Sequence, residues 1–225
     1  MLGIVTGIEA AEPGQPRDPD RPTRLLHAER DALLPILRRT PEQAFDRPTA
    51  CPGWSVRDVL AHCAAALSRT VSGDLHAFTP ELNEVDVARR RDWPLADVLA
   101  ELSAGYEQAG PAIAAAGGWL DAIALGEWLH GGDVREALGE PLAYASDGFD
   151  DACVLLGDWT RRRAVPLVEA RVADRSLTFG VPEPDRAPAT LFTSPGTLMR
   201  LFAGRPADAA DYELTGATTA ELVVF

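Results

Sequence analysis

The sequence contains no lysine, and all 21 of its basic residues are arginines. They are outnumbered by 34 acidic residues, which gives the chain a formal net charge of −13. An acidic chain of this kind repels the phosphate backbone of nucleic acids. The dense basic runs, at residues 89–91 and 161–163, are typical of solvated helix faces rather than of binding patches. We therefore expect no nucleic-acid partner.

Cysteines are few, and long apolar runs are absent. The three cysteines, Cys51, Cys63 and Cys153, are too few for a disulfide scaffold and lack the close spacing of a zinc clip. No apolar run approaches the roughly 20 residues that a membrane-spanning helix needs. The first residues have an apolar start but not the basic region of a signal peptide. These features predict a protein of the reducing cytoplasm without a membrane partner.

Most of the chain shows helical periodicity. Residues 1–22 are rich in proline and charge towards their end and are predicted to form a flexible arm. Residues 23–164 contain five helical patterns joined by short links, which favours an antiparallel bundle. These patterns begin near Thr23, Ser55, Pro94, Trp119 and Phe149.

The last part of the chain, residues 165–225, has a different pattern. Apolar residues alternate over 176–181 and, more weakly, over 211–216, which predicts two strands. Between them, residues 194–204 have a serine cap, a proline at the first helical position and a glycine at the end. The predicted fold is therefore mainly α, with a small C-terminal α/β domain after the helical bundle.

The stretch CPGWSVRDVLAHC contains the clearest helix start in the chain. Ser55 can cap the helix, and Asp58 stands three residues later, as a capping box requires. His62 lies at the edge of the apolar stripe that follows. A histidine in this position is either a satisfied core residue or a ligand. The stripe itself consists of Val56, Val59, Leu60, Cys63 and Leu67.

A second histidine, His130, has an acidic residue on each side at helical spacing. Glu127 precedes it by three residues and Asp133 follows it by three. Residues three apart are neighbours on a helix surface, so Glu127 and His130 can point to one place. If the two helices face each other, His62 could add a third ligand. Two histidines and one carboxylate with open positions suit zinc or another divalent first-row metal. The alternative is chance spacing around a surface or core histidine.

Two motifs carry a family resemblance. The stretch LLHAERDALLPILRRTPEQAFDRPTACPGWSVRDVLAHCAA, followed by EWLHGGDVREALGEPL, resembles the mycothiol-dependent maleylpyruvate isomerase family over residues 24–142. The later stretches GTLMRLFAGRP and YELTG are similar to the small C-terminal domain of that family. The resemblance implies a DinB-like four-helix bundle in which His62 and His130 bind a divalent metal.

The chain departs from the family pattern at the acidic ligand. In the family this ligand commonly stands four residues before the second histidine, where this chain has Gly126, and Glu127 stands one position nearer. One residue rotates a helical side chain by about 100°, which a long glutamate partly recovers. We expect Glu127 to complete the metal site. Asp133 either orients His130 or caps and solvates the helix end.

The resemblance also implies a chemistry. In the family, the metal holds the small-molecule thiol mycothiol, and a cation favours the reactive thiolate. The thiolate would add to a conjugated alkene, the new single bond would rotate, and elimination would return the other isomer. A transferase would release the thioether instead. Neither route needs a protein nucleophile, so Cys51 and Cys63 are interpreted as structural.

Other assignments remain open at this stage. Arg205 matches an arginine-bearing helix end in the family and is our candidate for binding a substrate carboxylate, although it could simply complement that helix end. The metal could instead activate water, which would give a hydrolase. A bundle that has lost full metal coordination could be a non-catalytic ligand-binding protein.

Overall fold

The computed structural model describes residues 16–75 and 79–225. They divide into two compact units, one from Arg17 to Ala152 and one that takes in Cys153–Phe225. Of the predicted arm, residues 1–15 lie outside the described part of the chain. The predicted division into a bundle over 23–164 and a small domain over 165–225 remains a proposal.

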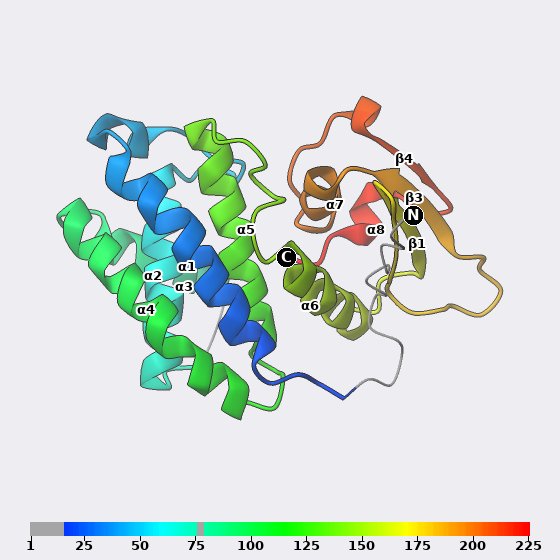
Figure 1. Ribbon diagram of the computed structural model, residues 1–225, viewed down its shortest axis with the longest axis horizontal. Coiled ribbons are helices and arrows are strands. Elements are labelled where there is room, and N and C mark those ends of the chain that lie inside the picture. Colours follow the sequence, from blue (N-terminus) through cyan, green and yellow to red (C-terminus); the bar gives the residue numbers. More distant parts are fainter. Residues whose placement is uncertain (1–15, 76–78) are drawn as a thin grey trace, which may run out of the picture. The chain divides into compact units, whose positions relative to one another are not determined.

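The first unit is built around four helices. Helices α1, α2, α4 and α5 form the bundle, and α1 and α2 each pack against both α4 and α5 (Figure 1). The predicted helical bundle is therefore confirmed. A further helix, α3, packs against α2 and was not predicted from the sequence. The elements of this unit are α1 (Arg21–Arg39), the 3-10 helix η1 (Glu42–Asp46), α2 (Val56–Ser72), α3 (Pro80–Arg90), α4 (Leu95–Ala115) and α5 (Asp121–Leu138).

Local signals place α2 as the sequence predicts. The Ser55 side chain accepts a hydrogen bond from the backbone of Asp58, and the Asp58 side chain accepts one from the backbone of Ser55. This capping box satisfies amide groups that the first turn of a helix leaves without partners. The helix ends at Gly73, whose φ of 76° is easily adopted by glycine. The whole predicted apolar stripe is buried: Val56, Val59, Leu60, Cys63 and Leu67.

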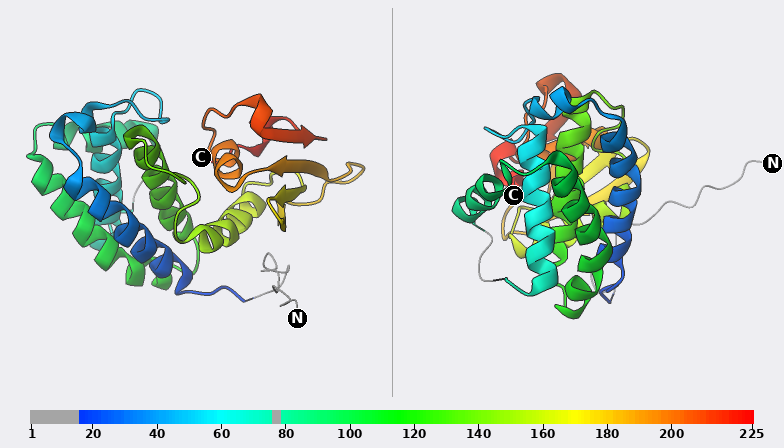
Figure 2. Two further views of the ribbon diagram at one scale, coloured as in Figure 1. Left: turned by 45° about the horizontal axis from the view of Figure 1, so that its top comes forward. Right: turned by 90° about the vertical axis from the view of Figure 1, so that its left-hand side faces the viewer.

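Because α1 and α2 lie diagonally in the bundle, their connection crosses one end of it. The connection includes η1, which packs against α2, and the CPGW stretch (Figure 2). The interior of the bundle is filled by large side chains that are almost fully buried, which gives the apolar burial that stabilises a bundle. These include Leu25, Leu26, Phe45, Leu102, Tyr106 and Trp128.

The second unit contains a four-stranded mixed sheet with the strand order β2-β1-β3-β4. Strand β1 pairs antiparallel with β2 and parallel with β3, and β3 pairs antiparallel with β4. Only β2 and β4 correspond to the strands predicted from alternation. The elements of this part are α6 (Phe149–Arg162), β1 (Val168–Val172), β2 (Arg175–Phe179), β3 (Ala189–Thr193), α7 (Pro195–Phe202), η2 (Ala209–Asp211), β4 (Tyr212–Thr215) and α8 (Thr219–Leu222).

Helix α6 begins in the first unit and ends in the second, where it is joined to the sheet. The Thr160 hydroxyl accepts a hydrogen bond from the Gly180 backbone, and the Trp159 indole donates one to the Val224 carbonyl. On the sheet, Phe179 packs against Phe202 of α7, with ring centroids 4.9 Å apart. The predicted small α/β part is confirmed. Over the described residues, no helix combines the length and apolar character that crossing a membrane requires.

Two glycines of α5 allow unusually close approaches within the first unit. A Cβ atom at Gly131 would overlap the carboxylate of Glu29 on α1. A Cβ atom at Gly132 would overlap the ring of Tyr144, in the loop after α5. Glu29 is fully buried and forms an ion pair with Arg135 at 2.5 Å. The GG pair therefore determines how closely α1 and the following loop approach α5.

We expect the variants Gly131→Ala and Gly132→Ala to lower the free energy of unfolding by about 1–3 kcal/mol, as overpacking does. The cost at Gly131 should be the larger because the added methyl group also displaces the buried Glu29–Arg135 pair. Chemical denaturation measures both values. The control is Gly196→Ala in α7, where no atom lies within 4 Å of the added Cβ. Wild-type stability in both α5 variants would contradict this account of the packing.

Candidate metal centre

The structure brings the two predicted histidines together. His62 lies on α2 and His130 on α5, and their ring centroids are 5.0 Å apart with the rings nearly perpendicular. The indole of Trp54 lies beside the pair, 4.9 Å from the His62 ring and 6.4 Å from the His130 ring. The condition that the two helices face each other is therefore met.

A tight turn before α2 places Trp54 and Cys51. The amide of Trp54 donates a hydrogen bond to the carbonyl of Cys51, with Pro52 and Gly53 between them. Gly53 has a φ of 82°, which is the conformation that the third position of a type II turn requires. The Trp54 indole also donates to the Glu84 carboxylate of α3 at 2.7 Å. The CPGW motif is therefore a turn that directs two side chains towards the histidine pair.

His62 is held in its neutral form. The pKa of His62 is lowered to about 3, mainly by burial and in smaller measure by the positive charges of a protonated His130 and of Arg69. A neutral imidazole has a free lone pair on one ring nitrogen, which is the form that binds metals. At neutral pH, His62 is therefore ready to act as a ligand.

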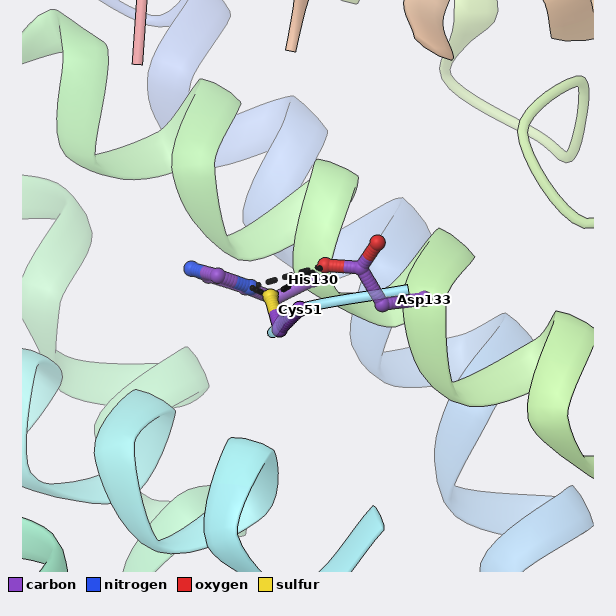
Figure 3. Close-up of side chains that lie close together, drawn as sticks. All are labelled: Cys51, His130 and Asp133. Atoms are coloured by element: carbon purple, nitrogen blue, oxygen red, sulfur yellow. Dashed lines mark hydrogen bonds and ion pairs between the residues drawn. The ribbon is translucent and has the colours of Figure 1, made fainter. Parts of the chain in front are cut away.

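His130 is held by Asp133, one turn later on α5. Its Nδ1 atom lies 3.0 Å from Oδ2 of Asp133, which is fully buried (Figure 3). The Tyr144 hydroxyl donates a hydrogen bond to the other oxygen of Asp133 at 2.6 Å. Of the two roles predicted for Asp133, this geometry favours orienting His130, because a fully buried carboxylate does not solvate a helix end.

Glu127 lies on α5 one turn before His130 and is buried, with 2% of its surface exposed. The thiol of Cys63, the residue next to His62 on α2, lies against its carboxyl group. Its Oε2 atom has no hydrogen-bond partner among the described residues. Burial raises the pKa of Glu127 well above its usual value. A cation would stabilise such a carboxylate. Glu127 does not belong to the grouping of ligand-type atoms within 4.8 Å of one another among the described residues, so its ligand role remains a proposal.

Cys51 also lies at the site, although no sequence pattern indicates this. Its thiol donates a hydrogen bond to Asp133 Oδ2 at 3.1 Å and lies 3.5 Å from His130 Nδ1 (Figure 3). One ligand-type atom each from Cys51, His130 and Asp133 lies within 4.8 Å of the others, a grouping that could hold a metal. The interpretation of Cys51 as merely structural missed these contacts, because they depend on how the loop before α2 crosses the bundle.

Arg205 lies just after α7, in the second unit. Its guanidinium donates a hydrogen bond to the carbonyl of Ala203, at the end of that helix. This contact is the one expected of a residue that complements a helix C-terminus. Arg205 as a binder of the substrate carboxylate remains a proposal.

Comparison with solved structures defines the class of fold. The chain is similar to the crystal structures of the mycothiol-dependent maleylpyruvate isomerase and of a variant of that enzyme in which one histidine is replaced by alanine. Both matches have a TM-score of 0.60 and cover 90% of this chain and 95% of the other chain. Sequence identity is 11% and 10%, respectively, so the likeness shows the fold alone. The fold is a DinB-like helical bundle with a small C-terminal α/β part.

The sequence identifies the family. Residues 25–141 match the family model described as the mycothiol maleylpyruvate isomerase N-terminal domain. The match spans more than half of the 225 residues. No curated protein matches the chain. The chain belongs to the mycothiol maleylpyruvate isomerase family.

We expect His62 to stay neutral in the metal-free protein as the pH is lowered from 7 to about 4, because burial lowers its pKa to about 3. In the unfolded chain the same histidine takes up a proton near pH 6.5. The unfolded state therefore binds more protons below that pH, and the contribution of His62 to stability falls between about pH 6.5 and 3. Nitrogen-15 NMR of the His62 ring measures the protonation directly. A midpoint near pH 6 would contradict the burial that we describe.

Proposed function

We propose that this chain is a metal- and mycothiol-dependent enzyme, either an isomerase or a thiol S-transferase, that acts on a small electrophilic molecule. The observation that carries the proposal is the facing pair His62 and His130, with ring centroids 5.0 Å apart, in a chain of the mycothiol maleylpyruvate isomerase family. Two imidazoles so placed on two packed helices could share one cation.

The residues present fit a divalent metal. His62, His130 and Glu127 would hold it, and the fit rests on the neutral imidazole of His62 and on the buried carboxyl oxygen of Glu127, which has no hydrogen-bond partner in the described chain. Imidazole and carboxylate ligands with an open position are typical of catalytic zinc, which is our choice of metal. A divalent cation in this place would favour the thiolate form of a bound thiol.

In this proposal, the protein's own side chains orient the metal ligands and bind the substrate. Asp133 orients His130, and the Trp54 ring covers one side of His62. The reacting sulfur would come from mycothiol, so the enzyme needs no nucleophile of its own. A conjugated alkene that bears a carboxylate is the substrate class that suits thiol addition, and Arg205 is our candidate for binding that carboxylate.

The cysteines support a reducing location. Cys51, Cys63 and Cys153 are all buried, and none of them forms a disulfide. Reduced cysteines are typical of the cytoplasm, where a low-molecular-weight thiol is also abundant. We therefore propose a cytoplasmic enzyme whose partners are a small-molecule substrate and mycothiol.

The metal site is tested by the zinc content of purified variants. We expect about one zinc ion per chain in the wild type and a loss of most of it in His62→Ala and His130→Ala, because each variant removes one ligand. Glu127→Gln should bind zinc at least tenfold more weakly. His27→Ala is the matched control, since His27 lies on α1, whereas His62 and His130 lie on α2 and α5.

Equal zinc content in the wild type and in the three histidine variants would rule out the site. A larger loss of affinity in Asp133→Asn than in Glu127→Gln would move the ligand role to Asp133.

Thiol dependence is tested by calorimetry. We expect the metal-loaded protein to bind mycothiol, and the binding to weaken at least tenfold after chelation, because the cation is what stabilises the thiolate. S-methylated mycothiol, which cannot form a thiolate, is the matched control ligand and should bind as weakly as mycothiol does after chelation. Metal binding without thiol binding would favour the hydrolase, and the absence of both would favour a non-catalytic ligand-binding protein.

A further inference from the structure

The carboxylate of Asp133 joins three side chains from three segments of the first unit. Tyr144, in the loop after α5, donates its hydroxyl proton to Oδ1 at 2.6 Å. Cys51, in the loop before α2, donates its thiol proton to Oδ2 at 3.1 Å. His130 Nδ1, on α5 itself, lies 3.0 Å from the same Oδ2 atom. Asp133 is 0% exposed and Tyr144 2% exposed, so water does not replace these partners.

These contacts fix where the proton of His130 lies. A carboxylate only accepts hydrogen bonds, so the close contact with Nδ1 is attractive only if Nδ1 carries the hydrogen. The neutral ring then has its lone pair on Nε2. In Figure 3 the far ring nitrogen of His130 points away from Asp133 and Cys51. The network therefore selects the tautomer in which Nε2 is the ligand atom.

Local features of the fold determine the positions of Cys51 and Tyr144. The tight turn over residues 51–54 holds Cys51 at the end of the bundle. The Tyr144 ring lies against α5 only because Gly132 has no Cβ atom to exclude it. A buried carboxylate needs hydrogen-bond donors to offset its lost hydration, and these two residues supply them.

We propose that Cys51 and Tyr144 are positioning residues for His130, acting through Asp133, and that Cys51 is neither a metal ligand nor a nucleophile. This inference rests on the proposed metal at His62 and His130. A different ligand set, Cys51, His130 and Asp133, would also be allowed by the distances between these residues. Our proposal assigns the metal to His62 and His130 instead. In our assignment, Cys51 and Asp133 stay hydrogen-bonded to each other when the metal binds.

Cobalt(II) distinguishes the two assignments, because a thiolate bound to cobalt gives a strong charge-transfer absorption band in the near ultraviolet. We expect the cobalt-loaded wild type to lack this band until a small thiol is added. A band in the thiol-free protein that disappears in Cys51→Ser would overturn the proposal, since it would make Cys51 a ligand.

Zinc affinity tests the positioning role. Cys51→Ala and Tyr144→Phe should each weaken zinc binding about tenfold, as the loss of a partner behind a ligand does. Cys51→Ser keeps a proton donor and should regain most of the affinity, which a lost sulfur ligand would not allow. Cys153→Ser, at another buried cysteine, is the control and should bind zinc as the wild type does.

The tautomer is measured without any metal. Nitrogen-15 NMR of the metal-free wild type should show His130 protonated at Nδ1, and Tyr144→Phe should increase the fraction protonated at Nε2. This measurement separates the positioning proposal from the proposed metal site. The tautomer of His130 can be determined even if the wild type binds no metal. If Cys51→Ala and Tyr144→Phe both keep the wild-type tautomer of His130 and the wild-type zinc affinity, the positioning role is overturned. Cys51 and Tyr144 would then contribute only to packing.

Discussion

The absence of side chains at Gly131 and Gly132 is the constraint on which the histidine site depends. Gly131 gives space to the Glu29 carboxylate, and Gly132 gives space to the Tyr144 ring. The two glycines lie directly between His130, which faces α2, and Asp133, which holds that histidine. Glycine in a helix interior costs about 1 kcal/mol relative to alanine. Here the two glycines allow the Glu29 carboxylate and the Tyr144 ring to approach α5 closely. The HGGDVR stretch is therefore a packing motif and a site motif together.

Buried carboxyl groups in the bundle are stabilised in three different ways. Glu29 is opposite a guanidinium, Arg135, at 2.5 Å. Asp133 accepts from a hydroxyl, a thiol and an imidazole. Glu127 lies against the thiol of Cys63 and keeps an oxygen that has no hydrogen-bond partner among the described residues. A thiol is a weak donor and carries no charge, so Glu127 is the carboxyl group of these three that gains most from a nearby cation.

The sequence predicts well what depends on local signals. The capping box of Ser55 and Asp58 and the apolar stripe of α2 both follow from residues close together in the chain, and the structure confirms them. The packing of α2 on α5, which brings His62 to His130, follows from the family resemblance, which implies a four-helix bundle.

What the sequence does not predict depends on contacts between distant residues. Cys51 meets Asp133, 82 positions later, only because a loop crosses the end of the bundle. Tyr144 gives no pattern because it stands in a loop, and its role requires the space above Gly132. The two inner strands β1 and β3 were missed as well, since their parallel pairing joins segments about 20 residues apart. Periodicity carries no information about such pairings.

The shift of the acidic residue from position 126 to position 127 can be interpreted in the same terms. Moving a carboxyl group by one residue along a helix rotates it by about 100°, which would turn an exposed side chain away from its neighbour. Here the rotated side chain is still buried and still meets α2, where it lies against Cys63, the residue adjacent to His62. The departure therefore changes the reach and the partner of the carboxyl group but keeps it in the interface between the two histidine-bearing helices. For this reason the chain can differ from its family at this position and still present a carboxylate to the same pair of helices.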